Sequence, residues 1–283
     1  MSDCLIDARS LAERLRGEEP PVLVDCRFDL AHPEAGREAY MRGHLPTACY
    51  AHLDADLSGP ASPASGRHPL PDHEDFAARC RAWGIGPGRL VVAYDDAGGA
   101  YAARLWWLLH WLGHAEAVVL DGGIQAWMAE GYALEQDEAT PRVGEFTGYP
   151  RAERVLDAET LQSLLHARRC RLIDVRTEAR FKGHVEPIDP VAGHVPGAVN
   201  HPYNRLLSED GRFLPPEALR AQIEAVLAGV SPDEAVAMCG SGVTACHLLL
   251  AMAHAGLPGA RLYAGSWSEW IRNPERPVSR IDR

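Results

Sequence analysis

The sequence consists of two related halves. Short motifs from the first half of this 283-residue chain return in the same order in the second half, at offsets of 143 to 150 residues. The motif pairs are VLVDCR (Val22–Arg27) with RLIDVR (Arg171–Arg176), GHLP (Gly43–Pro46) with GHVP (Gly193–Pro196), VVAYD (Val91–Asp95) with AVAMC (Ala235–Cys239), and DGGIQAW (Asp121–Trp127) with AGSWSEW (Ala264–Trp270). Such a long-period repeat indicates two copies of one domain. We expect domains at residues 1–135 and 155–283, joined by a linker at 136–154 that is charged, contains Pro and Gly, and lacks periodicity.

Each copy alternates short apolar runs with longer amphipathic segments. The apolar runs predict buried strands at Val22–Val24, Val91–Ala93, Val118–Leu120, Arg171–Ile173, Ala235–Met238 and Arg261–Tyr263. The amphipathic segments predict helices such as Asp72–Trp83, Ala100–Leu112, Pro216–Leu227 and Val243–Ala255. This alternation is typical of an α/β fold, with a parallel sheet in each domain and helices on both of its faces. Ligands of such sheets bind beyond the carboxyl ends of the strands, so functional residues are expected there.

Composition narrows the choice of partners and of compartment. The 28 basic and 39 acidic residues give a net charge of −11, and this negative field disfavours nucleic acid and anionic lipid as partners. The longest apolar run, Leu105–Leu112, is too short to span a bilayer. The amino-terminal segment mixes Asp, Arg and Glu and lacks the apolar core of a signal peptide. We therefore expect a cytoplasmic protein that binds neither nucleic acid nor membranes.

The cysteines give no sign of a disulfide framework. Their number is odd, they are scattered, and none forms a CxxC pair: Cys4, Cys26, Cys49, Cys80, Cys170, Cys239 and Cys246. In a chain without an export signal this pattern favours reduced thiols over disulfides or a zinc site. His110 and His114 are four residues apart but lack a neighbouring Glu, so we expect no metal.

One loop differs between the copies in a way that bears on chemistry. The first copy has Asp95 at the end of its strand, whereas the second has Cys239, followed by Gly240-Ser241-Gly242-Val243-Thr244 and a predicted helix. Glycines allow the loop to turn tightly and to aim backbone N–H groups inward, and the helix adds the positive end of its dipole. Both effects favour a thiolate, which is the nucleophilic form of cysteine. The alternative interpretation is a buried cysteine that acts only as a small apolar residue.

Other interpretations of this loop lack a residue that they need. Gly240-x-Gly242-x-x-Ala245 fits the dinucleotide fingerprint, but the next strand ends in Ala264 and offers no ribose-binding carboxylate. A cysteine phosphatase needs an arginine six residues after the cysteine, where this chain has Ala245. His247 has no correctly spaced metal-ligating partner. A reactive cysteine that uses no metal therefore remains the leading interpretation.

The arrangement of these motifs resembles the tandem rhodanese-type sulfurtransferases. The resemblance covers nearly the whole chain and includes CGSGVTA (Cys239–Ala245), the two GH[LV]P motifs and the AGSWSEW segment. It implies two rhodanese-like domains, of which only the second is catalytic. It further implies that Cys239 takes sulfur from a small anionic donor, forms a persulfide without any cofactor, and passes the sulfur to a thiol, thioredoxin or cyanide. The loop residues Gly240, Gly242, Val243 and Thr244 would hold the persulfide anion through their amides.

The resemblance also implies further site residues. A serine after the Cys-Gly pair looks like the 3-mercaptopyruvate branch of the family, in which Ser241 would work with His68 and Asp54 in a triad-like arrangement. Arg180, which precedes Phe181, matches the family's substrate-binding arginine. The mercaptopyruvate branch has a second arginine after Glu-Pro, where this chain has Ile188, and many relatives have Asp at the position of Ala264.

These departures leave the donor open. We expect a sulfurtransferase with 3-mercaptopyruvate as the favoured donor. The alternatives are a thiosulfate:cyanide sulfurtransferase on the same site, or a sulfur-carrier or regulatory binding module with little turnover alone. The field from the net charge of −11 repels an anionic donor, so the positive groups near Cys239 matter most.

Overall fold

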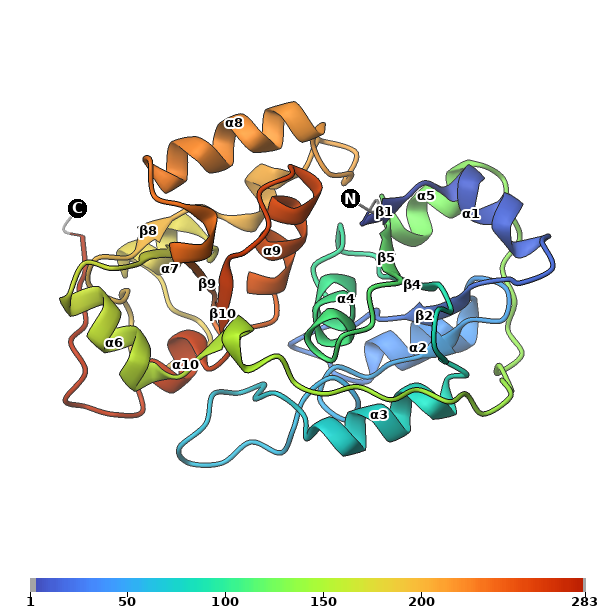
Figure 1. Cartoon of the computed structure of the whole chain (residues 1–283), viewed down its shortest axis with the longest axis horizontal. Helices are drawn as coiled ribbons and strands as arrows, with labels where there is room; N and C mark the ends of the chain where they lie inside the picture. The colour runs from blue at the N-terminus through green and yellow to red at the C-terminus, as the bar shows by residue number, and fades with distance from the viewer. Residues whose placement is uncertain (1–3, 282–283) are drawn as a thin grey trace. The chain divides into compact units, whose positions relative to one another are not determined.

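The computed structural model describes residues 4–281, and these divide into two compact units. The first contains residues 4–59, 70–151 and 209–213. The second contains residues 60–69, 152–208 and 214–281. Each unit has its own sheet (Figure 1). Each also has its own cluster of buried apolar side chains. The domain limits at 135 and 155 remain predictions from the sequence, whereas the short segment 60–69 packs with the second unit although it belongs to the first half of the sequence.

In the described residues, the first unit is built on one sheet of five parallel strands. Their order across the sheet is β1-β5-β4-β2-β3. The strands are β1 (Leu5–Ile6), β2 (Val22–Asp25), β3 (Cys49–Tyr50), β4 (Val91–Tyr94) and β5 (Ala117–Leu120). The central strands β2 and β4 are buried along their whole length, as expected for a parallel sheet that is covered on both faces.

Helices cover this sheet. They are α1 (Ala8–Leu15), α2 (Ala35–Arg42), α3 (His73–Ala82), α4 (Ala102–Trp111) and α5 (Gly123–Ala129). Helices α1 and α5 contribute to one core cluster with side chains of β2, β4 and β5, and α4 packs against β4 and β5. Asp7 caps α1 by accepting the N–H groups of Arg9 and Ser10. Helix α4 is almost entirely buried, which explains the continuous apolar run in its sequence.

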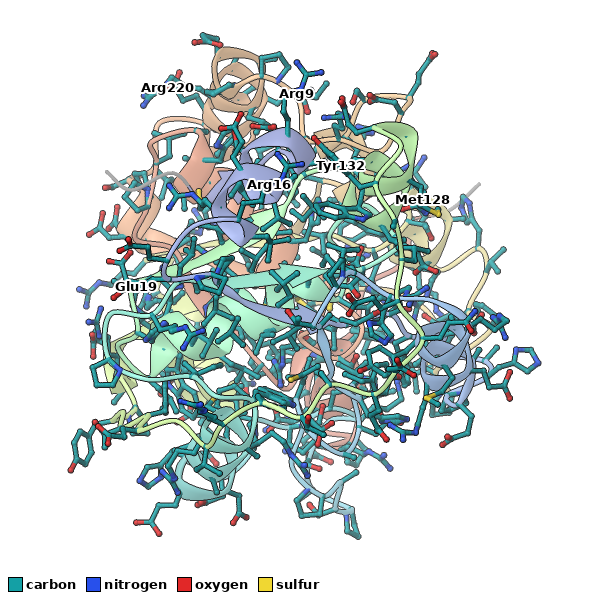
Figure 2. The ribbon with its side chains drawn as sticks, turned by 90° about the vertical axis from the view of Figure 1, so that its right-hand side faces the viewer. Arg9, Arg16, Glu19, Met128, Tyr132 and Arg220 are labelled. Atoms are coloured by element: carbon teal, nitrogen blue, oxygen red, sulfur yellow. The ribbon has the colours of Figure 1, made fainter. Side chains whose placement is uncertain are left out.

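Charged side chains lie on the outer surface of α1 and α5, beside one exposed large hydrophobic residue, Met128. Figure 2 shows Arg9 and Arg16 on and just after α1, and Met128 on α5. Arg9 forms an ion pair of 3.0 Å with Glu130, just after α5. Met128 is 47% exposed, and an isolated large hydrophobic side chain on a surface needs no special explanation.

The second unit repeats the architecture of the first. Within residues 4–281 its sheet also has five parallel strands, in the order β6-β10-β9-β7-β8. They are β6 (Val155–Leu156), β7 (Arg171–Asp174), β8 (Val199–Asn200), β9 (Ala235–Met238) and β10 (Arg261–Tyr263). The longer helices are α6 (Ala158–His166), α8 (Pro216–Leu227) and α9 (Ala245–His254), and the shorter ones are α7 (Glu178–Lys182) and α10 (Ser266–Trp270). Helices α6 and α10 share one core cluster with the sheet, and α9 packs against β9 and β10.

The repeated sequence motifs form the same buried ion pair in both units. Arg27 donates from Nη2 to Asp25 at 2.6 Å and to the carbonyl of Gly43 at 2.7 Å. In the second unit, Arg176 donates to Asp174 at 2.7 Å and to the carbonyl of Gly193 at 2.8 Å. The repeat therefore preserves a link between the second strand of each unit and the GH[LV]P turn.

The α/β fold class predicted from the sequence is confirmed, with two parallel sheets flanked by helices. The predicted strands and helices coincide with elements of the structure to within two residues at most ends. The strands that sequence patterns do not reveal are β1, β3, β6 and β8. Each contains only two residues and lies at a sheet edge, too short to show a periodic pattern.

Candidate active site

Cys239 lies directly after β9, at the carboxyl end of a central strand of the second sheet. Cys239 is 2% exposed, and its Sγ accepts the backbone N–H of Gly242 at 3.1 Å. The loop that follows leads into α9 through Thr244, which is the residue before the helix. The sulfur is thus held by a loop amide near the start of a ten-residue helix, where backbone N–H groups favour negative charge.

The tight turn of this loop requires glycine at position 242. Gly242 has a φ of +82°, and a Cβ there would collide with the carbonyl oxygen of Ala264. The absent side chain of Gly242 allows its backbone to approach that of Ala264 closely. This approach turns the N–H of Gly242 back toward Cys239.

The turn between β10 and α10 holds the Cys239 loop from the other side. The hydroxyl of Ser266 accepts the N–H of Cys239 at 3.1 Å and itself donates to the carbonyl of Tyr263 at 2.9 Å. The N–H groups of Trp267 and Ser268 donate to the carbonyls of Cys239 and Gly240 at 3.1 and 2.9 Å. The loop is therefore pinned by the AGSWSEW motif, a role that the sequence repeat alone did not reveal.

In the first unit, the equivalent loop surrounds the carboxylate of Asp95 with backbone N–H donors. This buried carboxylate accepts four backbone N–H groups at 2.8 to 2.9 Å. The donors lie in the loop and at the start of α4: Ala97, Gly99, Tyr101 and Ala102. The same type of loop therefore closes around a negative charge when a carboxylate stands at this position. Because a carboxylate cannot carry sulfane sulfur, this comparison supports Cys239 as the reactive position of the chain.

His68 and Ser241 meet in the second unit. The ring Nδ1 of His68 and Oγ of Ser241 form a hydrogen bond of 2.7 Å, and both residues are buried. The segment 60–69 carries His68 to this place: a Cβ on Gly66 would lie 2.5 Å from the carbonyl oxygen of Gly265, and the N–H of Arg67 donates to Ser268 Oγ at 3.0 Å. The structure thus brings together two of the residues predicted for the triad.

Asp54, Val243 and Thr244 differ in their burial. Asp54 is exposed in the first unit, where its N–H donates to the ring Nδ1 of His52 at 3.1 Å. Its part in a triad stays a prediction. Val243 is buried, whereas Thr244 is half-buried at the start of α9. The carbonyls of both already accept N–H groups of the first turn of α9, from Cys246 and His247.

Arg180 lies beside the Cys239 loop but is not free of partners. Its Nε and Nη2 donate to Glu186 at 3.0 and 2.8 Å, and Nη2 also donates to Asp189 at 3.1 Å. A Cβ on Gly240 would lie 3.6 Å from both Nη atoms of Arg180, so the guanidinium borders the loop. Ile188, where a second arginine was expected, is 42% exposed, and its N–H donates to Glu186.

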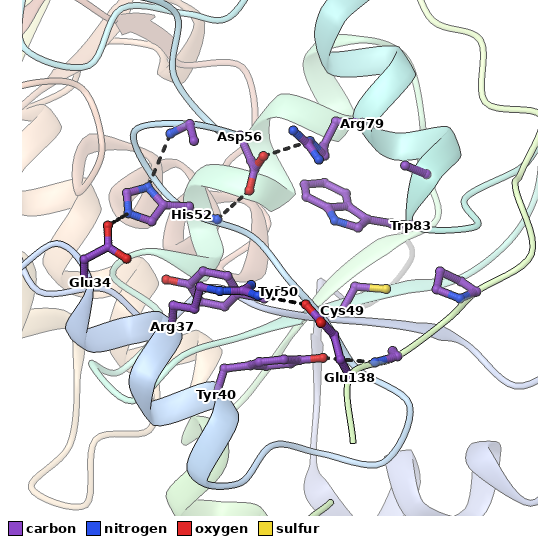
Figure 3. Close-up of a pocket in the computed structure, with 14 residues that line it drawn as sticks. Glu34, Arg37, Tyr40, Cys49, Tyr50, His52, Asp56, Arg79, Trp83 and Glu138 are labelled. Atoms are coloured by element: carbon purple, nitrogen blue, oxygen red, sulfur yellow. Dashed lines mark hydrogen bonds and ion pairs between the residues drawn. The ribbon is translucent and has the colours of Figure 1, made fainter. Parts of the chain in front are cut away.

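A separate cavity of about 450 Å³ lies in the first unit and contains none of the predicted site residues. Tyr50 and Trp83 line it together with the ion pairs Arg37–Glu138 and Arg79–Asp56 (Figure 3). Cys49 is also in its wall, and burial raises the pKa of this thiol to about 11. Cys49 is therefore protonated at neutral pH, which makes it a poor nucleophile.

The described part of the chain contains neither a candidate metal cluster nor a helix able to span a membrane. Residues 4–281 contain no cluster of three or more His, Cys, Asp or Glu side chains that could hold a metal ion. No helix in the same range is long and apolar enough to cross a membrane.

Comparison with known proteins agrees with the geometry. The model of the rhodanese-like domain matches the chain twice, at residues 7–130 and 157–273. A probable 3-mercaptopyruvate sulfurtransferase of Pseudomonas aeruginosa is 52% identical over 98% of both chains. A putative thiosulfate sulfurtransferase of Mycobacterium tuberculosis, SseB, is 39% identical over 98% of this chain and 96% of its own length. The crystal structure of SseA from Escherichia coli, a 3-mercaptopyruvate sulfotransferase by its description, superposes with a TM-score of 0.80 at 32% identity, covering 95% of this chain and all of that one.

Two rhodanese-like domains in one chain, together with relatives named sulfurtransferases over nearly its whole length, define the protein as a tandem-domain sulfurtransferase. A sulfur donor and a sulfur acceptor are accordingly its substrates. The chain belongs to the rhodanese family.

Sequence reasoning missed several residues that surround the Cys239 loop. Ser266 and Ser268 were visible only as part of a repeated motif, and the second copy differs from the first there, which was a usable signal. Arg67 and Asp189 were not singled out, although they are next to His68 and Ile188 in sequence. Nothing in the local pattern distinguishes these two charges from surface residues.

Proposed function

We propose that the protein transfers sulfur from 3-mercaptopyruvate, through a persulfide on Cys239, to a thiol acceptor such as reduced thioredoxin or to cyanide. The observation that carries this proposal is the 2.7 Å hydrogen bond between His68 and Ser241, two residues after Cys239. The three-carbon fragment of this donor leaves as a carbanion equivalent that needs a proton, and we assign the supply of that proton to this pair. The relatives named 3-mercaptopyruvate sulfurtransferases support the same donor.

In the first half-reaction, the Cys239 thiolate attacks the sulfur of 3-mercaptopyruvate. An S–S bond forms and the C–S bond breaks, so that its electron pair leaves with the three-carbon fragment as the enolate of pyruvate. The enolate takes a proton, which the hydroxyl of Ser241 supplies and His68 replaces. Cys239 then carries one additional sulfur, and pyruvate is released.

In the second half-reaction, an acceptor thiolate attacks the outer sulfur of the persulfide. The S–S bond breaks and returns its electron pair to Cys239 as a thiolate. The backbone N–H of Gly242, which already donates to Sγ, stabilises negative charge in both states of the cysteine. Separate half-reactions of this kind give ping-pong kinetics.

Thiosulfate is the second candidate donor, because the chain is 39% identical to a putative thiosulfate sulfurtransferase and has Ile188 in place of the second expected arginine. Steady-state rates with each donor, measured side by side with cyanide and then with a dithiol, decide between them. We expect a higher kcat/KM with 3-mercaptopyruvate.

The persulfide is tested separately by mass spectrometry. After treatment with 3-mercaptopyruvate, peptide mapping should place one added sulfur atom on Cys239. The matched variant Cys239→Ser should carry none and should be inactive with both donors. Turnover by this variant would refute the proposal, and a wild-type protein that reacts with donor only in the presence of another protein would favour the carrier function.

A further inference from the structure

Arg67 reaches the Cys239 loop on the same short segment as His68. This segment, residues 60–69, packs within the second unit, where the N–H of Arg67 donates to Ser268 Oγ. A Cβ on Gly240 would lie 3.0 Å from Nη2 of Arg67, closer than either Nη of Arg180. Two guanidinium groups from distant parts of the sequence therefore border the residue that follows Cys239.

A buried carboxylate holds the two arginines together. Asp189 accepts from Nη1 of Arg67 with Oδ1 and from Nη2 of Arg180 with Oδ2, and its side chain is 3% exposed. Without this carboxylate the two cations would repel each other at short range. Asp189 thus acts as a positioning residue that lets a second cation stand beside Arg180.

Some of the arginine donors remain available. The Nε of Arg67 is buried and has no hydrogen-bond partner among the described residues. Its Nη2 faces Gly240, while Nη1 is the atom that binds Asp189. A buried donor without a partner is costly, and a ligand with anionic oxygen atoms would satisfy it.

Arg67 provides a positive charge beside the Cys239 loop that position 188 lacks. The resemblance to the mercaptopyruvate branch predicts an arginine at position 188 of this chain, where Ile188 offers no charge. Arg67 supplies a guanidinium beside the same loop from a different segment. An anionic donor approaching a chain of net charge −11 needs such a group.

We propose that Arg67 binds the carboxylate of the sulfur donor together with Arg180, and so acts as a specificity-determining residue of the Cys239 site. This inference rests on the proposed function, because it takes the donor to be a 2-oxo carboxylate. Arg67 places the carboxylate, and its neighbour His68 serves the proton transfer at Ser241. One segment thereby contributes to both substrate binding and chemistry.

The test compares Arg67→Met, which keeps the stem but removes the charge, with Arg67→Lys and with Arg272→Met. Arg272 is exposed in the same unit and lies outside the site, so it controls for the loss of one positive charge. Kinetics with 3-mercaptopyruvate and a dithiol give kcat and KM. Calorimetric titration with pyruvate, which carries the carboxylate but no transferable sulfur, measures binding without turnover.

We expect Arg67→Met to raise KM about 10- to 100-fold with kcat changed less than about threefold, as for loss of a charge-assisted hydrogen bond. Pyruvate binding should weaken by a similar factor, Arg67→Lys should recover part of it, and Arg272→Met should behave as the wild type. Unchanged KM and pyruvate affinity in a folded Arg67→Met protein would overturn the inference, as would a fall in kcat alone. Failure of the wild type to use 3-mercaptopyruvate would instead refute the proposed donor. The pyruvate titration would still test whether Arg67 binds a carboxylate.

Discussion

The ring Nδ1 of His68 lies 2.7 Å from Oγ of Ser241, although 173 positions separate the two residues in sequence. The hydroxyl is in the loop that begins at Cys239, and the imidazole is on the segment that also carries Arg67. Both side chains are buried, so their hydrogen bond is shielded from bulk water. In the proposed mechanism, this pair delivers the proton that the three-carbon fragment takes up beside Cys239.

Removal of this pair should lower kcat more than it changes KM. For His68→Gln and Ser241→Ala we expect kcat with 3-mercaptopyruvate to fall about 10²-fold or more, the usual contribution of a positioned acid or base. The double variant should lose little more than either single variant, because the two residues act as a unit. Strictly additive losses in this double-mutant cycle would show that the residues act independently.

The Asp95 carboxylate should contribute strongly to the stability of the first unit. Asp95→Ala leaves the backbone N–H groups around it buried without an acceptor, at about 1–3 kcal/mol for each unsatisfied group. We expect urea unfolding to show a loss of at least about 2 kcal/mol, whereas Asp95→Asn, which retains one oxygen, should lose less. Equal stability of both variants and the wild type would contradict this role.

The two buried Arg–Asp pairs should differ in their sensitivity to substitution. Arg27→Ala and Arg176→Ala each leave a fully buried carboxylate, at a cost of about 3–5 kcal/mol. Asp25 still accepts the hydroxyl of Tyr94 at 2.8 Å, whereas the equivalent residue in the second unit, Met238, offers no donor. We therefore expect the Arg176 variant to lose more stability in denaturant titrations.

An exposed arginine provides the scale for this comparison. The exposed pair Arg220–Glu224 at 3.2 Å serves as the control, and Arg220→Ala should change the free energy of unfolding by less than about 1 kcal/mol. The guanidinium of Arg176 also lies 4.7 Å from the ring centroid of Trp267, which adds to its loss. A smaller effect for Arg176→Ala than for Arg27→Ala would be contrary to expectation.

Gly242→Ala should disrupt the Cys239 loop beyond the ordinary cost of a left-handed backbone. Gly229 has nearly the same φ, +85° against +82°, but a Cβ there meets nothing within 4 Å. Gly229→Ala should therefore cost about 1–2 kcal/mol and leave activity intact. Gly242→Ala adds a collision with the carbonyl of Ala264, so persulfide formation should fall at least about tenfold, as followed by mass spectrometry. Equal behaviour of the two variants would exclude this steric explanation.

Stability should decrease as the pH falls below the ordinary histidine range. Burial lowers the pKa of His201 below its usual value of 6.5, with a further contribution from the charge of Arg205. The folded state therefore favours the neutral ring. The stability of the folded state that depends on this neutral ring is fully present above pH 6.5, and it is lost as the pH falls through 6.5 toward the lowered pKa. Urea midpoints at about pH 7.5 and 5.5 should differ less in His201→Gln than in the wild type. An unchanged difference would remove His201 as a cause.

Much of the fold was predictable from local patterns. Apolar runs such as Val91–Ala93 and Ala235–Met238 mark buried parallel strands, because every position along such a strand faces a covered surface. The repeat identified two equivalent units, and the exchange of Asp95 for Cys239 led to the proposal that Cys239 is the reactive thiol. Edge strands such as β3 were missed, since two residues contain no period.

The sequence by itself thus determined the α/β class, the duplication and the position of Cys239, because these depend on periodicity and on comparison of the two copies. The tertiary structure alone decided which charges stand around that cysteine. Arg67 and His68 belong to the first half of the sequence, yet their segment packs within the second unit against the turn at Gly265. The path of a loop depends on close packing between distant backbone segments, such as Gly66 against Gly265, and a local pattern carries no record of such a contact.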